Sequence, residues 1–145
     1  MTSIYVLCGI PGSGKTTLAQ ELANRHGAVL RSYDDMPGAN TRESMDGSVT
    51  REWLNIIHAD LMAGKSVVCD GMNLTSKDRL EVLSAISDIP CRKVLAFKFV
   101  PIDTCIKRNA QRHGRLPYFV IEQAAQKMEP PTGEECWDEI ITYEN

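Results

Sequence analysis

Gly9-Ile10-Pro11-Gly12-Ser13-Gly14-Lys15-Thr16 matches the phosphate-binding loop pattern G-x-x-x-x-G-K-S/T at every fixed position. The apolar run before it, residues 4–8, is typical of a buried strand. Residues 17–23 after it have the apolar spacing of a helix. Strand, loop and helix in this order are the setting that the motif requires. In that setting the glycines allow a tight turn, so successive N–H groups and the helix N-terminus point at one anion.

This loop predicts a site for a nucleoside triphosphate with Mg²⁺. The residues expected to surround the phosphates are Gly9, Gly12, Ser13, Gly14 and Thr17. The Lys15 ammonium would contact the β- and γ-phosphates, and the Thr16 hydroxyl would ligate Mg²⁺. A glycine-rich turn with a surface lysine is the plain alternative, but such a turn needs neither Lys15 nor Thr16.

Length and composition narrow the class of protein. A chain of 145 residues predicts one domain with a single core, too small for a motor. The net charge of −3 does not indicate general nucleic-acid affinity. The five cysteines are odd in number and lack a C-x-x-C pair, which favours reduced thiols and a cytoplasmic location over disulfides or a zinc site. We find no signal peptide and no apolar run long enough to span a membrane.

Predicted strands and helices alternate along the chain, which is typical of parallel βαβ units with helices on both faces of a sheet. Apolar runs predict strands at 4–8, 28–32, 66–70, 94–100 and 137–143. Helical spacing predicts helices at 17–23, 48–61, 75–89, 103–112 and 117–128, the third with Leu80, Leu83, Ile86 and Ile89 as its apolar residues. The phosphate loop, Asp34-Asp35 and Asp70 each follow a predicted strand end. Because ligands bind at the carboxyl ends of parallel strands, we expect these three segments to meet in one site.

The acidic residues at these strand ends are candidates for phosphoryl-transfer chemistry. Asp34 or Asp35 is the candidate base for an acceptor hydroxyl, and strand alternation predicts that only one of them faces the cleft. An Asp-Asp turn open to solvent is the alternative. Asp70 resembles the acidic strand end that helps hold Mg²⁺ in phosphate-loop proteins, with a helix-cap or turn role as its alternative.

Basic residues gather late in the chain, at Lys107, Arg108, Arg112 and Arg115. On a helix, Arg108 and Arg112 lie one turn apart and share a face. Gly114 after them predicts a hinged lid around residues 103–117, in which Arg108 contacts the nucleotide and Arg112 stabilises charge that develops in the transition state. A solvated basic face is the alternative, and we prefer it for Lys107 and Arg115.

Four segments together resemble a known family. They are Gly9–Thr17, Tyr33-Asp34-Asp35, Asp70-Gly71-Met72-Asn73-Leu74 and Ile106–Arg112. In this order they resemble the 5′-kinase domain of phage polynucleotide kinase and its P-loop kinase relatives, the zeta-toxin-like or AAA-33 group. The resemblance spans nearly the whole chain. It implies a three-layer P-loop NTPase fold, with a parallel sheet of about five strands in the order 2-3-1-4-5, in a single kinase domain over residues 1–145.

The resemblance also implies roles for individual residues. Lys15 and Thr16 would hold the ATP phosphates and Mg²⁺, and Arg112 would be the lid arginine. Asp34 would activate the acceptor hydroxyl, and Asp70 would lie on the acceptor side of the cleft. The chain departs from the family in one respect, which concerns the acceptor. Polynucleotide kinases carry an arginine three residues after the base, where this chain has Pro37; Arg42 is the candidate replacement for holding the acceptor.

Three functions remain open at this stage. The first is an ATP- and Mg²⁺-dependent kinase that phosphorylates a hydroxyl, such as the 5′-OH of a polynucleotide. The second is the same chemistry on a small acceptor such as a nucleotide-sugar, sugar acid or nucleoside. The third is a nucleotide-binding regulatory module with little turnover. A base aspartate and a lid arginine favour the enzymes. The sequence leaves the acceptor and the oligomeric state open.

Overall fold

The computed structural model describes residues 1–112 and 115–144. Within these residues the chain forms a sheet of five parallel strands in the order β2-β3-β1-β4-β5. The strands are β1 (Ser3–Cys8), β2 (Val29–Ser32), β3 (Val67–Asp70), β4 (Arg92–Phe99) and β5 (Glu139–Glu144). In this order β3 pairs directly with β1, with Ile4 opposite Val67. The strand order that the resemblance implies is therefore confirmed.

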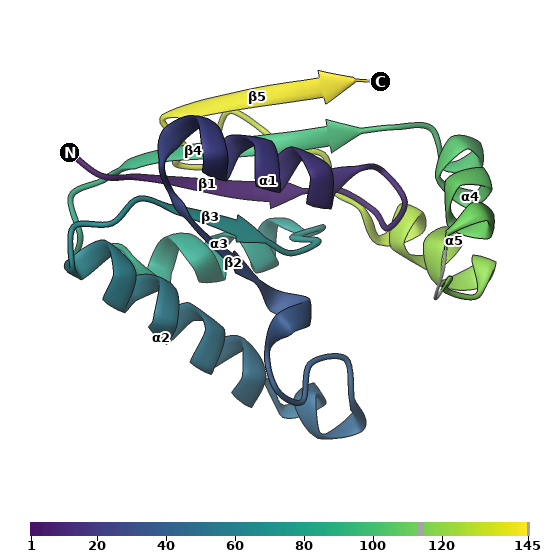
Figure 1. The fold of residues 1–145 in the computed structure, drawn as a ribbon, viewed down its shortest axis with the longest axis horizontal. Helices are drawn as coiled ribbons and strands as arrows, with labels where there is room; N and C mark the ends of the chain where they lie inside the picture. Colours follow the sequence, from purple (N-terminus) through teal and green to yellow (C-terminus); the bar gives the residue numbers. More distant parts are fainter. Residues whose placement is uncertain (113–114, 145) are drawn as a thin grey trace.

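Helices cover both faces of the sheet (Figure 1). The helices are α1 (Lys15–His26), α2 (Ser48–Met62), α3 (Ser76–Ala85), α4 (Ile102–Gln111) and α5 (Tyr118–Lys127). On one face, Leu18 and Leu22 of α1 pack against Leu7 and Val68. On the other face, α2 and α3 pack against the opposite side of the same strands, around the side chain of Trp53. The three-layer arrangement is thus confirmed.

For the predicted third helix, the sequence pattern gives the correct N-cap but neither the correct end nor all of the buried side chains. Thr75 caps it as expected, because its hydroxyl oxygen accepts from the Asp78 N–H at 3.1 Å. The prediction that the helix reaches Pro90 is wrong: α3 ends at Ala85, and hydrogen bonds from residue i to i−3 tighten the chain through Ile89. The apolar pattern is confirmed for Ile86 and Ile89, which are buried, but is wrong for Leu80, which is 61% exposed. The buried residues of α3 are Arg79 and Val82.

Helices α4 and α5 lie together beyond the carboxyl ends of β1 and β4 (Figure 1). They share a small apolar cluster with the phosphate loop, in which Cys105 and Ile121 are completely buried beside Ile10. Arg112 follows the last residue of α4 as its C-cap. His113 and Gly114, the predicted hinge of the lid, lie outside the described residues.

All five cysteines are free, and four of them are buried. Cys8 and Cys69 are completely buried in the sheet, as predicted for small apolar side chains. Burial raises the pKa of Cys8 to about 11, so at neutral pH it is an uncharged thiol. In the described part of the chain, no helix is both long enough and apolar enough to cross a membrane.

Candidate active site

The phosphate loop joins β1 to α1 by a turn that only glycine accommodates. Gly12 and Gly14 have φ angles of +85° and +89°, in the left-handed region. A Cβ atom on Gly12 would also lie 2.6 Å from the carbonyl oxygen of Cys105, so helix α4 packs directly on the loop. No side chain caps the N-terminus of α1, and its first turn holds no acidic residue. The first N–H groups of the helix are therefore available to an anion.

The Ser13 side chain provides evidence that the phosphate loop binds a ligand. Its side chain is completely buried, and its Oγ atom has no hydrogen-bond partner in the structure. A buried hydroxyl without a partner is costly and calls for an explanation. An oxygen of a bound phosphate group would supply the missing partner, so the residues of the loop fit a nucleotide phosphate.

Lys15, Thr16 and Asp70 meet beside the loop. The Lys15 Nζ atom lies 3.4 Å from Asp70 Oδ1, and the Thr16 hydroxyl donates to Asp70 Oδ2 at 3.3 Å. Asp70 ends β3 and is only 4% exposed. Hydroxyl and carboxylate oxygens are ligands that Mg²⁺ prefers. Among the described residues, no three or more His, Cys, Asp or Glu side chains are grouped so that they could hold a metal ion.

The two arginines predicted to share a helix face are placed differently. Arg108 donates from Nη1 to the Ser13 carbonyl oxygen at 3.3 Å, which joins α4 to the phosphate loop. The Arg112 side chain is exposed and makes no hydrogen bond or ion pair with any described residue. Asn109, which sequence reasoning missed, exchanges two hydrogen bonds with the backbone of Leu116, at 2.6 and 3.0 Å. The Asn109 side chain therefore joins α4 to the chain just before α5, within the segment predicted to be a lid.

Asp34 and Asp35 lie in a short 3₁₀ turn, Tyr33–Asp35, directly after β2. The argument that strand alternation lets only one of them face the cleft is therefore wrong, because neither belongs to a strand; both are exposed. The side chains still differ, since Asp34 Oδ1 accepts a hydrogen bond from Asn40 Nδ2 at 2.8 Å. Asn40 has a φ of +61°, a conformation that asparagine tolerates better than most residues. Arg42 is exposed and contacts neither aspartate by a hydrogen bond or ion pair.

Arg79 is a second residue that the apolar pattern missed. It is completely buried and forms a two-bond pair with the Glu135 carboxylate at 2.8 and 3.0 Å. It also donates to the carbonyl oxygens of Asn73, Leu74 and Glu129 at 2.9–3.0 Å. Burial raises the pKa of Glu135, but the hydrogen bonds from Arg79 and Trp137 together with the Arg79 charge more than offset this, so its pKa lies below the ordinary value. Arg79 thus ties the segment after Asp70 to the chain that follows α5.

We expect Arg79→Met to lower the free energy of unfolding by about 3–5 kcal/mol, because it leaves a largely buried carboxylate without its cationic partner. Urea denaturation followed by circular dichroism measures the change. Arg92→Met is the matched control, since the Arg92–Glu139 ion pair is about half exposed and such pairs contribute about 0–1 kcal/mol. Equal losses in the two variants would contradict the role of Arg79.

A five-stranded parallel sheet of this order, with a phosphate loop between β1 and α1, defines a P-loop kinase fold. The chain belongs to the AAA_33 family, because the model of that family, described as an AAA domain, matches residues 4–131.

Curated relatives extend the comparison. The protein kti12 of Schizosaccharomyces pombe is 24% identical over 93% of this chain and 54% of its own length. The L-seryl-tRNA(Sec) kinase of Methanococcus maripaludis is 21% identical over 93% of this chain and 56% of its own length. The chain therefore spans about half the length of the curated relatives it matches.

Solved structures share the fold. A sugar kinase from Janibacter sp. HTCC2649 aligns with a TM-score of 0.76 at 20% identity, over 99% of this chain and 86% of that one. Kti12 of Chaetomium thermophilum in complex with ADP-AlF3 aligns with a TM-score of 0.73 at 17% identity, over 97% and 89%. A fungal RNA kinase aligns with a TM-score of 0.74 at 18% identity, over 97% and 38%. At these identities the structures establish the fold of this chain.

Proposed function

We propose that this chain is an ATP- and Mg²⁺-dependent kinase that transfers the γ-phosphoryl group to a hydroxyl acceptor. One observation carries the proposal. Lys15, Thr16 and Asp70 converge within 3.3–3.4 Å beside an uncapped helix N-terminus, at the edge of the sheet where the Asp34 turn also begins. The complex of the similar Kti12 structure with ADP-AlF3 supports a nucleotide at such a loop.

In this proposal each residue has one task. The N–H groups from Gly12 to Thr16 bind the β- and γ-phosphates, and Lys15 neutralises charge on them. When bound, Mg²⁺ would be held by Thr16, assisted by Asp70, and would neutralise phosphate charge. Asp34 accepts the proton of the acceptor hydroxyl through the oxygen that Asn40 leaves free. Arg108 holds α4 on the loop and contacts the nucleotide.

Room for the rest of the nucleotide lies on the α1 side of the loop. A hollow of about 490 Å³ adjoins Gly14 and Thr17 and is bounded by Lys98, Arg108 and Tyr143. Its volume falls in the range of small-ligand pockets. We propose that the nucleoside of ATP lies here, with Arg112 closing over the phosphates from the end of α4.

Two classes of acceptor have support. The likeness to an RNA kinase fold and to a seryl-tRNA(Sec) kinase supports a polynucleotide or RNA-linked hydroxyl. Pro37, in the place of an expected arginine, and an Arg42 that contacts neither aspartate support a small molecule instead. Labelled ATP incubated with DNA, RNA and small hydroxyl compounds tests both classes. A polynucleotide acceptor would lose affinity steeply with added salt, whereas a small uncharged acceptor would not.

A regulatory nucleotide-binding module is the second candidate function, and the similarity to kti12, whose name states no kinase activity, leaves it open. Such a module would bind ATP, hydrolyse it slowly and phosphorylate none of the acceptors. A stimulation of ATP turnover by an acceptor would exclude it.

Asn40 provides a test of how the proposed base is positioned. We expect Asn40→Gly to lower kcat by between about 10- and 100-fold, because loss of the amide frees Asp34 to move by on the order of 1 Å. Glycine is chosen because it accepts the φ of +61° at this position. Steady-state kinetics should show an unchanged KM for ATP.

Thr41→Ala is the matched control for Asn40→Gly. The Thr41 hydroxyl donates to the Gly38 carbonyl oxygen at 2.7 Å in the same turn but does not touch Asp34. We expect its kcat to stay within about 2-fold of the original protein. An equal loss in both variants would show that the turn, and not the Asn40 amide, matters.

A further inference from the structure

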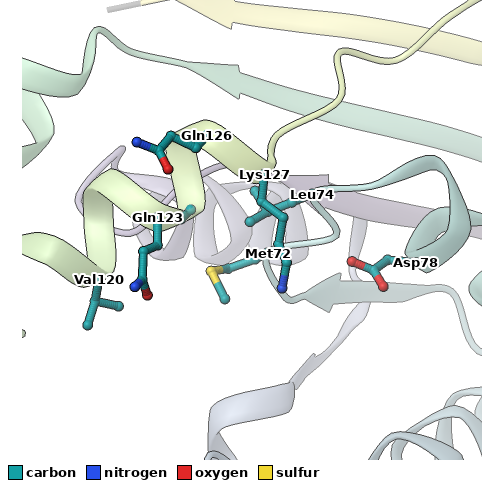
Figure 2. A pocket seen from close by; sticks show the side chains of 8 residues that line it. Met72, Leu74, Asp78, Val120, Gln123, Gln126 and Lys127 are labelled. Carbon is teal, nitrogen blue, oxygen red and sulfur yellow. The ribbon is translucent and has the colours of Figure 1, made fainter.

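A pocket of about 590 Å³ lies between α5 and the segment after β3 (Figure 2). One wall is formed by Met72 and Leu74, and the other by residues of α5 that include Val120, Gln123 and Lys127. The pocket adjoins the phosphate loop, because the carbonyl oxygen of Met72 accepts from the Gly9 N–H at 3.0 Å. Met72 is also the second residue after Asp70. The pocket therefore opens close to where the γ-phosphate would lie.

The two walls are joined behind the pocket. Arg79 donates to Leu74 on one side and to Glu129, just after α5, on the other. The Glu129 N–H also donates to the Leu74 carbonyl oxygen at 2.8 Å. Because these bonds are buried or partly buried, the pocket keeps its shape without a ligand. A preformed hollow of this volume is typical of small-molecule sites.

The charged and polar side chains that line the pocket indicate what kind of ligand it would bind. Figure 2 shows Met72, Gln123 and Lys127 extending to the same side of α5. Lys127 forms no ion pair with any described residue, so its charge is available to a ligand. The Asp78 carboxylate also lines the pocket, at the same end as Lys127 and away from Val120. With one cation and one anion, the pocket accommodates one negative group; a second would meet Asp78 without a cation to offset it.

We propose that this pocket binds the phosphate acceptor and selects a compact polyhydroxylated molecule with one carboxylate or phosphate group, which Lys127 holds. The inference rests on the proposed kinase function. The amide of Gln123 can donate to and accept from hydroxyl groups, while Met72 and Val120 cover the carbon chain. A polynucleotide carries a charge on every phosphate and is ordinarily bound by several Lys and Arg residues, whereas this wall supplies one.

A structural role for Lys127 makes a different prediction. A lysine in the last turn of a helix interacts favourably with the helix dipole, which stabilises α5 without any ligand. In that case Lys127→Gln would shift the unfolding transition slightly and would leave ligand selection unchanged. The test therefore measures discrimination between ligands.

Three probes with the same six-carbon polyol chain provide that measurement: D-gluconate, sorbitol 6-phosphate and uncharged sorbitol. Their affinities are measured by calorimetry with Mg²⁺ and a non-hydrolysable ATP analogue present. We expect at least one anionic probe to bind about 10- to 100-fold more tightly than sorbitol, as a hydrogen bond to a charged group implies. Whether gluconate or sorbitol 6-phosphate binds better identifies the anionic group. Lys127→Gln should remove this difference and leave the affinity for the ATP analogue unchanged.

Lys65→Gln is the matched control, because this exposed lysine lies at the amino end of β3, whereas the pocket lies beyond the carboxyl end of that strand. We expect it to keep the full discrimination. Equal affinity for all three probes, binding of none of them, or discrimination that survives Lys127→Gln would overturn the inference. Phosphorylation of a 5′-hydroxyl oligonucleotide, but of neither anionic probe, would also overturn it while the kinase function stands. If the ATP analogue itself does not bind, the proposed function fails instead.

Discussion

Lys15→Ala is expected to remove phosphoryl transfer almost entirely, with a fall in kcat of at least about 10²- to 10³-fold. Lys15 would supply positive charge where negative charge develops on the transferred group, and no other lysine or arginine among the described residues pairs with Asp70. The side chain is only 13% exposed and lies against Asp70, not in the apolar core. Kinetics with labelled ATP and calorimetric titration with ATP measure the effect.

Two controls keep this result interpretable. Lys65→Ala removes the same charge from an exposed site at the amino end of β3, and we expect its kinetics to be unchanged. Thermal unfolding should show that Lys15→Ala is still folded, because the packing of α1 depends on Leu18 and Leu22. A folded Lys15→Ala variant with normal ATP affinity and turnover would contradict the assignment of the site.

Asp34→Asn is the second substitution for which we expect a large loss. If Asp34 accepts the proton of the acceptor hydroxyl, kcat should fall by about 10²- to 10⁴-fold. ATP affinity should change little, because the proposed task of Asp34 concerns the acceptor. Asparagine keeps the size of the side chain and an oxygen that can still accept from Asn40, so the turn is retained.

Asp35→Asn is the natural comparison, since Asp35 is exposed in the same 3₁₀ turn and has no side-chain partner among the described residues. We expect a change in kcat of no more than about 3-fold. Similar losses in both variants, or a larger loss in Asp35→Asn, would assign the base differently.

Several local features of this protein were predictable from the sequence because neighbouring residues determine them. The glycines of the phosphate loop adopt the positive φ angles that the motif requires. Helix α2 begins at Ser48, as its apolar spacing predicts, and Thr75 caps α3. The strand order came from the resemblance to the AAA-33 group and is confirmed.

Contacts between distant segments were decided only by the tertiary structure. Arg79 has the appearance of a surface residue in a helical pattern, yet it is buried because carbonyl oxygens and Glu135, 56 positions away in the chain, converge on it. The Asn40–Asp34 hydrogen bond forms in a turn where Asn40 has a positive φ angle, and no sequence motif predicts that turn. Pocket walls built from residues near 72 and near 123 are likewise brought together by the packing of α5. Local sequence patterns determine how each segment folds, because turn geometry, helix capping and apolar spacing act over a few residues. Which polar side chains pair with one another depends instead on how those segments pack together in the tertiary structure.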